Sequence, residues 1–333
     1  MRAFWDSGIT IENDGFKLIL DPSRTVVKQE KTLVGISHAH SDHVKGHNSS
    51  VVLTQPTSDL FFCSGEKRHL KYHEEMEFGG MTISLLNANH ILGSSQFKIE
   101  NGKTIVYTGD FRLQKSPLFG ECEVPKCDSL IIESTYGMPH FKFPTMEQVS
   151  SDIEKWVKQN KASNIVFGAY ALGKSQELIR ILNDAHITPV VHSYVHSVSK
   201  IYEKNGVKIG DFVNAESEEG KEMMKDSFVG IVPNRLIKPE FLEGLSNQTK
   251  RETKAAMATG WGMLYSFPAV DKVFCLSDHS DFYQLLEYVK QSGAKEVFTV
   301  HGYEEQFASE IRRRLKINAK PLKGIQHRLF EFW

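Results

Sequence analysis

Short apolar runs separated by polar turns dominate the first third of the chain, and this spacing predicts β-strands. Two pairs of runs are joined by Asn13-Asp14-Gly15 and by Asn101-Gly102, which are residues that favour β-hairpin turns. The strands predicted in this region cover Ile9–Leu20 (as a hairpin), Thr32–Ser37, Val51–Thr54, Met81–Leu86, Gln96–Glu100, Thr104–Thr108 and Leu130–Glu133.

The pattern changes near Glu147, where helical spacing of apolar residues alternates with short buried runs, as in α/β proteins. Residues 203–254 are charged and interrupted by Gly and Pro, so loops and short elements are expected there. The helices predicted in the rest of this part cover Met146–Asn160, Leu172–Asn183, Tyr283–Gln291 and Glu304–Leu315. The strands predicted there cover Asn164–Phe167, Pro189–Val191, Val273–Leu276 and Val297–Val300.

Composition places the chain among soluble globular proteins, because 40% of its 333 residues are hydrophobic and 24% are charged. The net charge of -1 argues against a protein that coats nucleic acid through bulk positive charge. No apolar run approaches the ~18 residues of a membrane helix, and Met1–Thr10 lacks the apolar core of a signal peptide. A cytoplasmic location is expected, because four cysteines are too few for a disulfide scaffold and fit reduced, buried thiols: Cys63, Cys122, Cys127 and Cys275.

A cluster of metal-ligand side chains directly follows the run Thr32–Ser37. It reads His38-Ala39-His40-Ser41-Asp42-His43 and matches the pattern H-x-H-x-D-H. The first two histidines can converge on one ion, and the Asp and His that follow can hold a second ion nearby. Imidazole and carboxylate together suit zinc, manganese or iron(II) better than magnesium or calcium. The cluster therefore predicts a metal centre, with a metal-free surface loop as the alternative.

This string resembles the signature of the metallo-β-lactamase fold, an αββα sandwich with its site at one edge. The resemblance implies a third histidine after a later strand and then an aspartate shared by two metals. Asn89-His90-Ile91-Leu92-Gly93 and Thr108-Gly109-Asp110 resemble those two motifs. A shared carboxylate is physically sensible, because it screens the repulsion between two dications about 3.5–4 Å apart.

Three further segments resemble the motifs of the β-CASP branch, which acts on nucleic acids. Ile131–Gly137 resembles its motif A, Leu276–Asp281 its motif B, and Val300-His301-Gly302 its motif C. The gap between motifs A and B is long enough for the inserted β-CASP α/β domain that clamps the substrate. The expected organisation is a catalytic metallo-β-lactamase domain formed by 1–144 and 266–333, with a β-CASP domain at 145–265.

The resemblance also assigns roles to individual residues. It implies a first metal held by His38, His40, His90 and Asp110, and a second held by Asp42, His43, Asp110 and His301. Zinc is the favoured metal for both positions and manganese is the alternative. A hydroxide activated by the two metals would attack phosphorus in line. The catalytic residues are then Asp42, His279 as the acid that protonates the leaving oxygen, and Glu133, which orients the imidazole of His279.

Phe167–Glu177 and Ala258-Thr259-Gly260-Trp261 extend the likeness to the ligase-associated DNA exonucleases. Because a Gly-Lys-Ser step opening a helix can bind phosphate, Lys174 and Ser175 are candidate substrate contacts, together with Thr259 and Gly260 in the later loop. An ordinary surface lysine at position 174 is the alternative, and Trp261 is a packing residue or a stacking platform for a base.

The favoured hypothesis is a metal-dependent exonuclease acting on DNA ends in repair, with nucleic acid as partner. A DNA ligase or helicase partner follows from the resemblance alone. The first alternative is a β-CASP ribonuclease in RNA 3′-end processing or decay, to which His301 points. A lactam or thioester hydrolase is disfavoured, because it has no use for Glu133 and His279. A non-enzymatic binding subunit is disfavoured, because every ligand position is filled.

Overall fold

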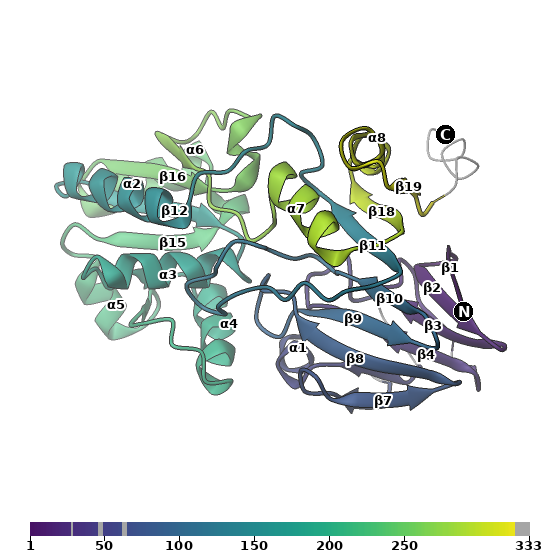
Figure 1. The fold of residues 1–333 in the computed structure, drawn as a ribbon. Coiled ribbons are helices and arrows are strands. Elements are labelled where there is room, and N and C mark those ends of the chain that lie inside the picture. The colour runs from purple at the N-terminus through teal and green to yellow at the C-terminus, as the bar shows by residue number, and fades with distance from the viewer. Residues whose placement is uncertain (28, 46–48, 62–64, 324–333) are drawn as a thin grey trace, which may run out of the picture. The chain divides into compact units, whose positions relative to one another are not determined.

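The computed structural model describes residues 1–27, 29–45, 49–61 and 65–323, so Cys63 lies outside the described residues. Contacts between residues divide the chain into two compact units (Figure 1). The first unit comprises 1–115, 121–142 and 279–333, and the second comprises 116–120 and 143–278. None of the helices in the described ranges is long and apolar enough to cross a membrane.

One sheet of the first unit contains the predicted hairpin. The strands flanking Asp14-Gly15 pair antiparallel with Asn13 opposite Phe16, which confirms the turn prediction. The next strands join parallel, so the sheet runs in the order β1-β2-β3-β4-β5-β6. Its strands are β1 (Arg2–Trp5), β2 (Ile9–Asn13), β3 (Phe16–Leu20), β4 (Thr32–Gly35), β5 (Val51–Leu53) and β6 (Lys67–His69).

The second sheet of this unit contains the other predicted hairpin, with Thr104 opposite Glu100. Its order is β19-β18-β11-β10-β9-β8-β7, antiparallel from β7 to β10 and parallel from β10 to β19. Its strands are β7 (Glu75–Phe78), β8 (Met81–Asn87), β9 (Ser95–Glu100), β10 (Thr104–Tyr107), β11 (Ser129–Ser134), β18 (Glu296–Gly302) and β19 (Asn318–Pro321).

The two sheets pack face to face around one apolar core. Ile11 and Leu18 of the first sheet share this core with Ile83 and Phe97 of the second. The outer face of the second sheet is covered by α7 (Phe282–Ser292) and α8 (Glu304–Leu315). Phe61, at the end of α1 (Gln55–Leu60), packs on the outer face of the first sheet. This layering confirms the metallo-β-lactamase αββα sandwich.

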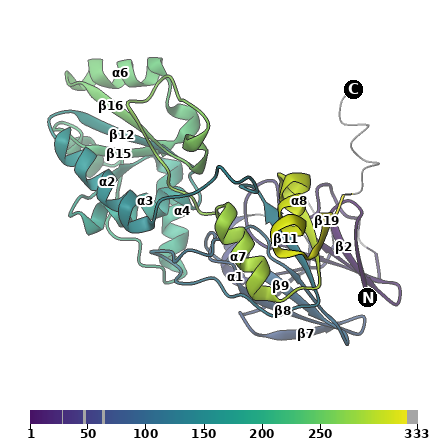
Figure 2. The same cartoon turned by 45° about the horizontal axis from the view of Figure 1, so that its top comes forward.

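The second unit is an α/β domain with one parallel sheet, β14-β13-β15-β12-β16-β17. Helices cover both faces of this sheet (Figure 2). Val166 packs against the helix that starts at Pro239, whereas Phe167 points to the opposite face and contacts Trp156. The strands are β12 (Asn164–Ala169), β13 (Val190–Val191), β14 (Val213–Asn214), β15 (Val229–Pro233), β16 (Thr253–Ala258) and β17 (Lys272–Phe274). The helices are α2 (Met146–Gln159), α3 (Lys174–Asp184), α4 (Ser193–Lys204), α5 (Glu218–Met223) and α6 (Pro239–Thr249), with 3-10 turns η1 (Asn234–Leu236) and η2 (Gly260–Met263).

The structure differs from the sequence-based expectations in two places. Residues 203–254 were expected to form loops and short elements, and they do so except for the 11-residue helix α6, which Pro239 starts and whose apolar side packs on the sheet. The second unit continues past residue 265 to Asp278, because β17 pairs with β16. Residues 116–120 also join this unit, where Phe119 contacts Tyr202.

Candidate metal centre

The candidate metal ligands stand where strands of both sheets of the first unit end. The loop His38–His43 follows β4, His90 follows β8, Asp110 follows β10, and His301 lies near the end of β18. Four side chains each present one ligand atom within 4.8 Å of the others: His38, His40, His90 and Asp110. Loops from distant parts of the sequence thus bring together one group of three imidazoles and a carboxylate.

Asp110 lies between the three imidazoles of this group and a second set of side chains, His43 and His301. Its Oδ2 is 3.5 Å from Nε2 of His38 and 3.4 Å from Nε2 of His43. The ring of His43 in turn lies 5.0 Å from the ring of His301, centroid to centroid. One carboxylate therefore borders both sets, which is the arrangement that a carboxylate shared by two ions requires.

Several buried polar atoms in this cluster make no hydrogen bond to the described residues. They are Nε2 of His38, Oδ1 of Asp110 and Nε2 of His301. Burying polar atoms without a partner costs free energy, so native proteins rarely leave them in this state. Divalent cations would satisfy these atoms, and imidazole with carboxylate is a donor set that suits such ions. The residues present thus fit divalent metal binding.

Electrostatics in the cluster favour the metal-binding forms of His38 and Asp110, and a protonated form of His43. Burial, together with the neighbouring His43, lowers the pKa of His38 well below its usual value, so this imidazole is neutral. Burial alone would also lower the pKa of His43, but Asp110 and Asp21 raise it well above the usual value. Burial would raise the pKa of Asp110, yet His43 holds it well below its usual value. Asp110 is therefore ionised, and a cation can replace the proton that His43 carries.

Asp21, at the end of β3, is a residue of the site that the sequence analysis missed. Its buried carboxylate accepts hydrogen bonds from the backbone N–H of Ser37 (2.7 Å), from Nδ1 of His43 (2.8 Å) and from the hydroxyl of Tyr107 (2.8 Å). The hydroxyl of Ser37 donates to it as well. A carboxylate behind a ligand histidine fixes the orientation of the ring. The feature of the sequence that could have pointed to Asp21 is its position, as an acidic residue directly after the apolar run that ends at Leu20.

Asp42 stands apart from these buried groups. Its side chain is 75% exposed, and its Oδ2 lies 3.6 Å from Nε2 of His43. It therefore lies at the rim of the cluster, within reach of the second set.

His301 is held in the left-handed backbone region (φ 54°), and the hydroxyl of Ser134 donates to its carbonyl oxygen. Such backbone conformations in non-glycine residues often accompany functional sites.

Glu133 and His279 form a pair beside the cluster. Nδ1 of His279 lies 3.0 Å from Oε1 of Glu133, a side chain with no exposed surface. Glu133 is itself held by the backbone N–H groups of Phe111 (3.1 Å) and Thr135 (3.2 Å). Asp110, Glu133 and His279 each present an atom within 4.8 Å of the others. The pair thus places an oriented imidazole next to the candidate metal ligands.

The structure gives the predicted substrate contacts two different environments. Lys174 is 5% exposed and its ammonium pairs with Asp278, and the buried hydroxyl of Ser175 donates to the carbonyl of Tyr170. Neither side chain is presented to solvent as a phosphate contact would be, which argues against the roles predicted for them. Thr259 and Gly260 are also buried, but Thr259 lines an open cavity of the second unit.

Comparisons with known proteins agree with the fold. Residues 269–321 match the family described as "Zn-dependent metallo-hydrolase RNA specificity domain". A crystal structure of a protein of unknown function from Enterococcus faecalis V583 has a TM-score of 0.67 over 97% of both chains at 13% identity. At that level of identity the likeness concerns the fold alone.

Three curated relatives are named as a ligase, a cleavage factor and an exonuclease. A probable DNA ligase of Opitutus terrae is 29% identical over 84% of this chain and 28% of its own length. Cleavage and polyadenylation specificity factor subunit 3 of Dictyostelium discoideum is 35% identical over 46% of this chain and 20% of its own length. The 5′ exonuclease Apollo of Gallus gallus is 26% identical over 77% of this chain and 55% of its own length. The chain thus spans between a fifth and just over half of these relatives. The sandwich, the inserted domain and these relatives together indicate the metallo-β-lactamase superfamily and, within it, the β-CASP nuclease branch.

Proposed function

We propose that the protein is a metal-dependent nuclease that hydrolyses phosphodiester bonds in nucleic acid. The observation that carries this proposal is the His279–Glu133 pair at 3.0 Å, in one group with Asp110. A thioester hydrolase releases a thiolate, which is a good leaving group, whereas cleavage of a phosphodiester bond benefits from an acid that protonates the leaving oxygen. The pair supplies such an acid beside the metal ligands.

In this proposal His38, His40, His90 and Asp110 hold one cation. The other cation would be held by His43, His301 and the same Asp110, together with Asp42 at the rim of the site. When bound, two divalent cations acidify a water molecule towards neutral pH and stabilise the charge that develops on the phosphate. Zinc is the proposed metal, with manganese as the alternative, because the same ligands accept both.

Two carboxylates, Glu133 and Asp21, orient the histidines that take part in the proposed reaction. Glu133 accepts a hydrogen bond from Nδ1–H of His279 and thereby keeps the other ring nitrogen, Nε2, as the one that can pass a proton to the leaving oxygen. Asp21 keeps Nδ1 of His43 occupied, so that Nε2 of His43 serves as the ligand. Burial of Glu133 and Asp110 strengthens these interactions relative to bulk water.

His279→Ala tests the proposal directly. We expect cleavage of an end-labelled oligonucleotide to slow about 10²–10⁴-fold, the usual contribution of general acid–base catalysis. Metal content, measured by elemental analysis, should stay at the wild-type level. Unchanged cleavage by the variant would exclude His279 as the acid, and absence of cleavage by the wild-type protein would favour a binding subunit.

Within this activity, we favour a DNA exonuclease that processes ends during repair, working in the cytoplasm. Two relatives that cover most of this chain support this choice, because one is named a probable DNA ligase and the other a 5′ exonuclease. The same similarity supports a DNA ligase as functional partner, and a helicase is a weaker proposal. RNA is the second candidate substrate, because the matched RNA specificity domain covers both His279 and His301.

The choice of substrate can be tested with matched molecules. End-labelled single-stranded DNA and RNA of one sequence, incubated with zinc or manganese, should give product ladders for DNA at the higher rate. A ladder that shortens from one end identifies an exonuclease, whereas early internal products identify an endonuclease. Faster cleavage of RNA would replace the DNA proposal with the RNA alternative.

A further inference from the structure

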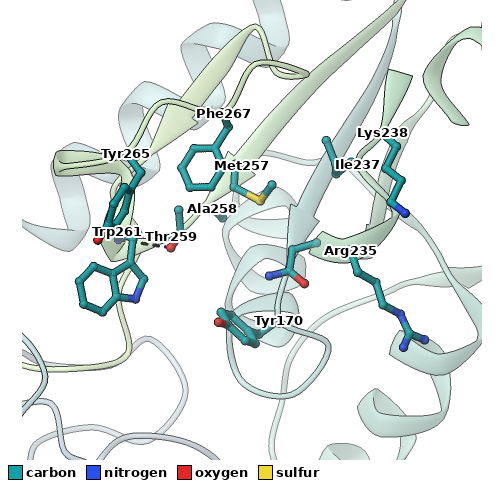
Figure 3. Close-up of a pocket in the computed structure, with 11 residues that line it drawn as sticks. Tyr170, Arg235, Ile237, Lys238, Met257, Ala258, Thr259, Trp261, Tyr265 and Phe267 are labelled. Atoms are coloured by element: carbon teal, nitrogen blue, oxygen red, sulfur yellow. Dashed lines mark hydrogen bonds between the residues drawn. The ribbon is translucent and has the colours of Figure 1, made fainter. Parts of the chain in front are cut away.

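A cavity of about 610 Å³ lies in the second unit, at the carboxyl ends of the neighbouring parallel strands β15, β12 and β16 (Figure 3). Tyr170 follows β12, Arg235 lies in η1 after β15, and Trp261 lies in η2 after β16. In open α/β sheets, ligands bind outside the carboxyl ends of the strands. Sites for small molecules usually measure about 300–1,000 Å³, so the cavity can hold one nucleotide.

Aromatic side chains form one part of its lining. Tyr170 and Tyr265 are 48% and 57% exposed, and the ring centroids of Trp261 and Tyr265 are 6.0 Å apart. The turn η2 holds this pair in place, because the N–H of Trp261 donates to the hydroxyl of Thr259 (3.3 Å) and the N–H of Tyr265 donates to the carbonyl of Trp261 (3.1 Å). Rings that are held in place and open to solvent are suited to stacking on a ligand.

Two positively charged side chains lie across the cavity from Trp261 and Tyr265 (Figure 3). Arg235 and Lys238 are exposed, and neither forms an ion pair within the described ranges, whereas Lys254 in the same unit pairs with Glu252. The described lining contains no acidic side chain. Between the cations and the rings, the buried side chains of Ile237 and Met257 form an apolar floor. The cavity thus combines stacking surfaces with positive charge, which is the complement of a base and its phosphate.

We propose that this cavity binds one unpaired nucleotide of a single-stranded nucleic acid, with the base on the aromatic rings and the phosphate near Arg235 and Lys238. The proposal rests on the proposed nuclease function, because it assigns part of the substrate of that enzyme to the second unit. Stacking on Tyr or Trp accepts every base, so the site tolerates any sequence. It selects single strands, because bases in a duplex are already stacked on their neighbours.

The test is an abasic scan in the presence of a chelator, so that the intact protein binds without cleaving. A short single-stranded oligonucleotide is made in versions that each lack one base, and the Kd of each version is measured. For the wild-type protein we expect one position at which loss of the base weakens binding about 5–100-fold, the range of a base stacked on an aromatic residue. In Tyr265→Ala or Trp261→Ala, the complete oligonucleotide should bind correspondingly weakly and removal of that base should have no further effect.

Matched variants separate the cavity from general effects. Tyr194 is 55% exposed in the same unit but lies outside the cavity, so Tyr194→Ala should bind as the wild-type protein does. Lys238→Glu should weaken binding and reduce its dependence on salt, whereas Lys208→Glu, at another exposed lysine, should do so much less.

Two outcomes of the abasic scan overturn the proposal. One is an abasic scan without a sensitive position, and the other is a Tyr265→Ala variant that keeps the wild-type sensitivity. Failure of the nuclease proposal can be distinguished from failure of this one. A wild-type protein that shows the abasic effect but never cleaves with metal would support nucleotide binding in the cavity and contradict the nuclease activity. Binding that responds equally to Tyr194→Ala would also count against the cavity.

Discussion

Nδ1 of His43 lies 2.8 Å from a carboxylate oxygen of Asp21, and both side chains are 1% exposed. Because Asp21 occupies Nδ1, the nitrogen that faces Asp110 is Nε2, at 3.4 Å. A carboxylate that is buried away from solvent thus decides which nitrogen of His43 is offered to a metal.

Asp21→Asn should weaken, about 10–100-fold, binding of the cation that we propose is held by His43, since an amide cannot accept from all the donors that surround this carboxylate. A metal titration of the chelator-treated protein measures the change. Asp14→Asn, at an exposed turn position, is the matched control and should bind as the wild-type protein does. Equal affinity in Asp21→Asn would show that Asp21 does not position His43.

Asp110→Asn and His301→Ala should differ in the number of metals lost. Asp110 borders both sets of side chains, so its substitution should reduce the content of both cations. His301 lies beside His43, so its loss should reduce the content of one cation only. Elemental analysis of the purified variants gives the two stoichiometries. Retention of both metals by Asp110→Asn would contradict the shared-carboxylate arrangement.

Removal of metal with a chelator should lower the Tm of the wild-type protein. A ligand present at about a hundred times its Kd stabilises the folded state by about 2.7 kcal/mol, and this contribution disappears with the metal. Calorimetry with and without chelator measures the shift. His38→Ala removes a buried ligand atom, so its Tm should respond much less to the chelator, and an equal response would place the stabilising metal elsewhere.

Lys174→Met should destabilise the protein by about 3–5 kcal/mol, because it leaves the carboxylate of Asp278 buried without the ammonium that pairs with it. Urea unfolding provides the measurement. Lys208→Met, at an exposed lysine, should stay within about 0.5 kcal/mol of the wild-type protein. A Lys174→Met variant with unchanged stability but weaker substrate binding would instead support the phosphate contact predicted from the sequence.

Glu310 in α8 should make a contribution to stability that depends on pH. Hydrogen bonds from Arg313 and Arg314 hold its pKa below the usual 4.5. A lowered pKa in the folded state stabilises the protein above the usual pKa, and this contribution is lost as pH falls through the lowered value. Glu310→Gln should therefore cost about 0.5–1 kcal/mol at neutral pH and progressively less in acid, as measured by urea unfolding. A difference that grows in acid would contradict this sign.

Much of the fold could be predicted from the sequence, because hairpin turns and apolar spacing act over a few residues. The two hairpins and α8 appear where they were predicted. The prediction for 203–254 missed α6, because charged residues on the solvent side of this helix hid the apolar side that packs on the sheet. Strand β17 was also expected in the other domain, since its pairing partner β16 cannot be inferred from local pattern.

The sequence by itself determined the set of candidate metal ligands, because residue types at short, fixed spacings mark them within each loop. Only the tertiary structure decided which residues from distant segments come into contact and interact. Asp21 supports His43, Asp278 neutralises Lys174, and Tyr170, Arg235 and Trp261 surround one cavity, although each of these residues is unremarkable in its own segment. Hydrogen bonds, ion pairs and cavities depend on which strands become neighbours in a sheet, and that outcome depends on the packing of the whole unit.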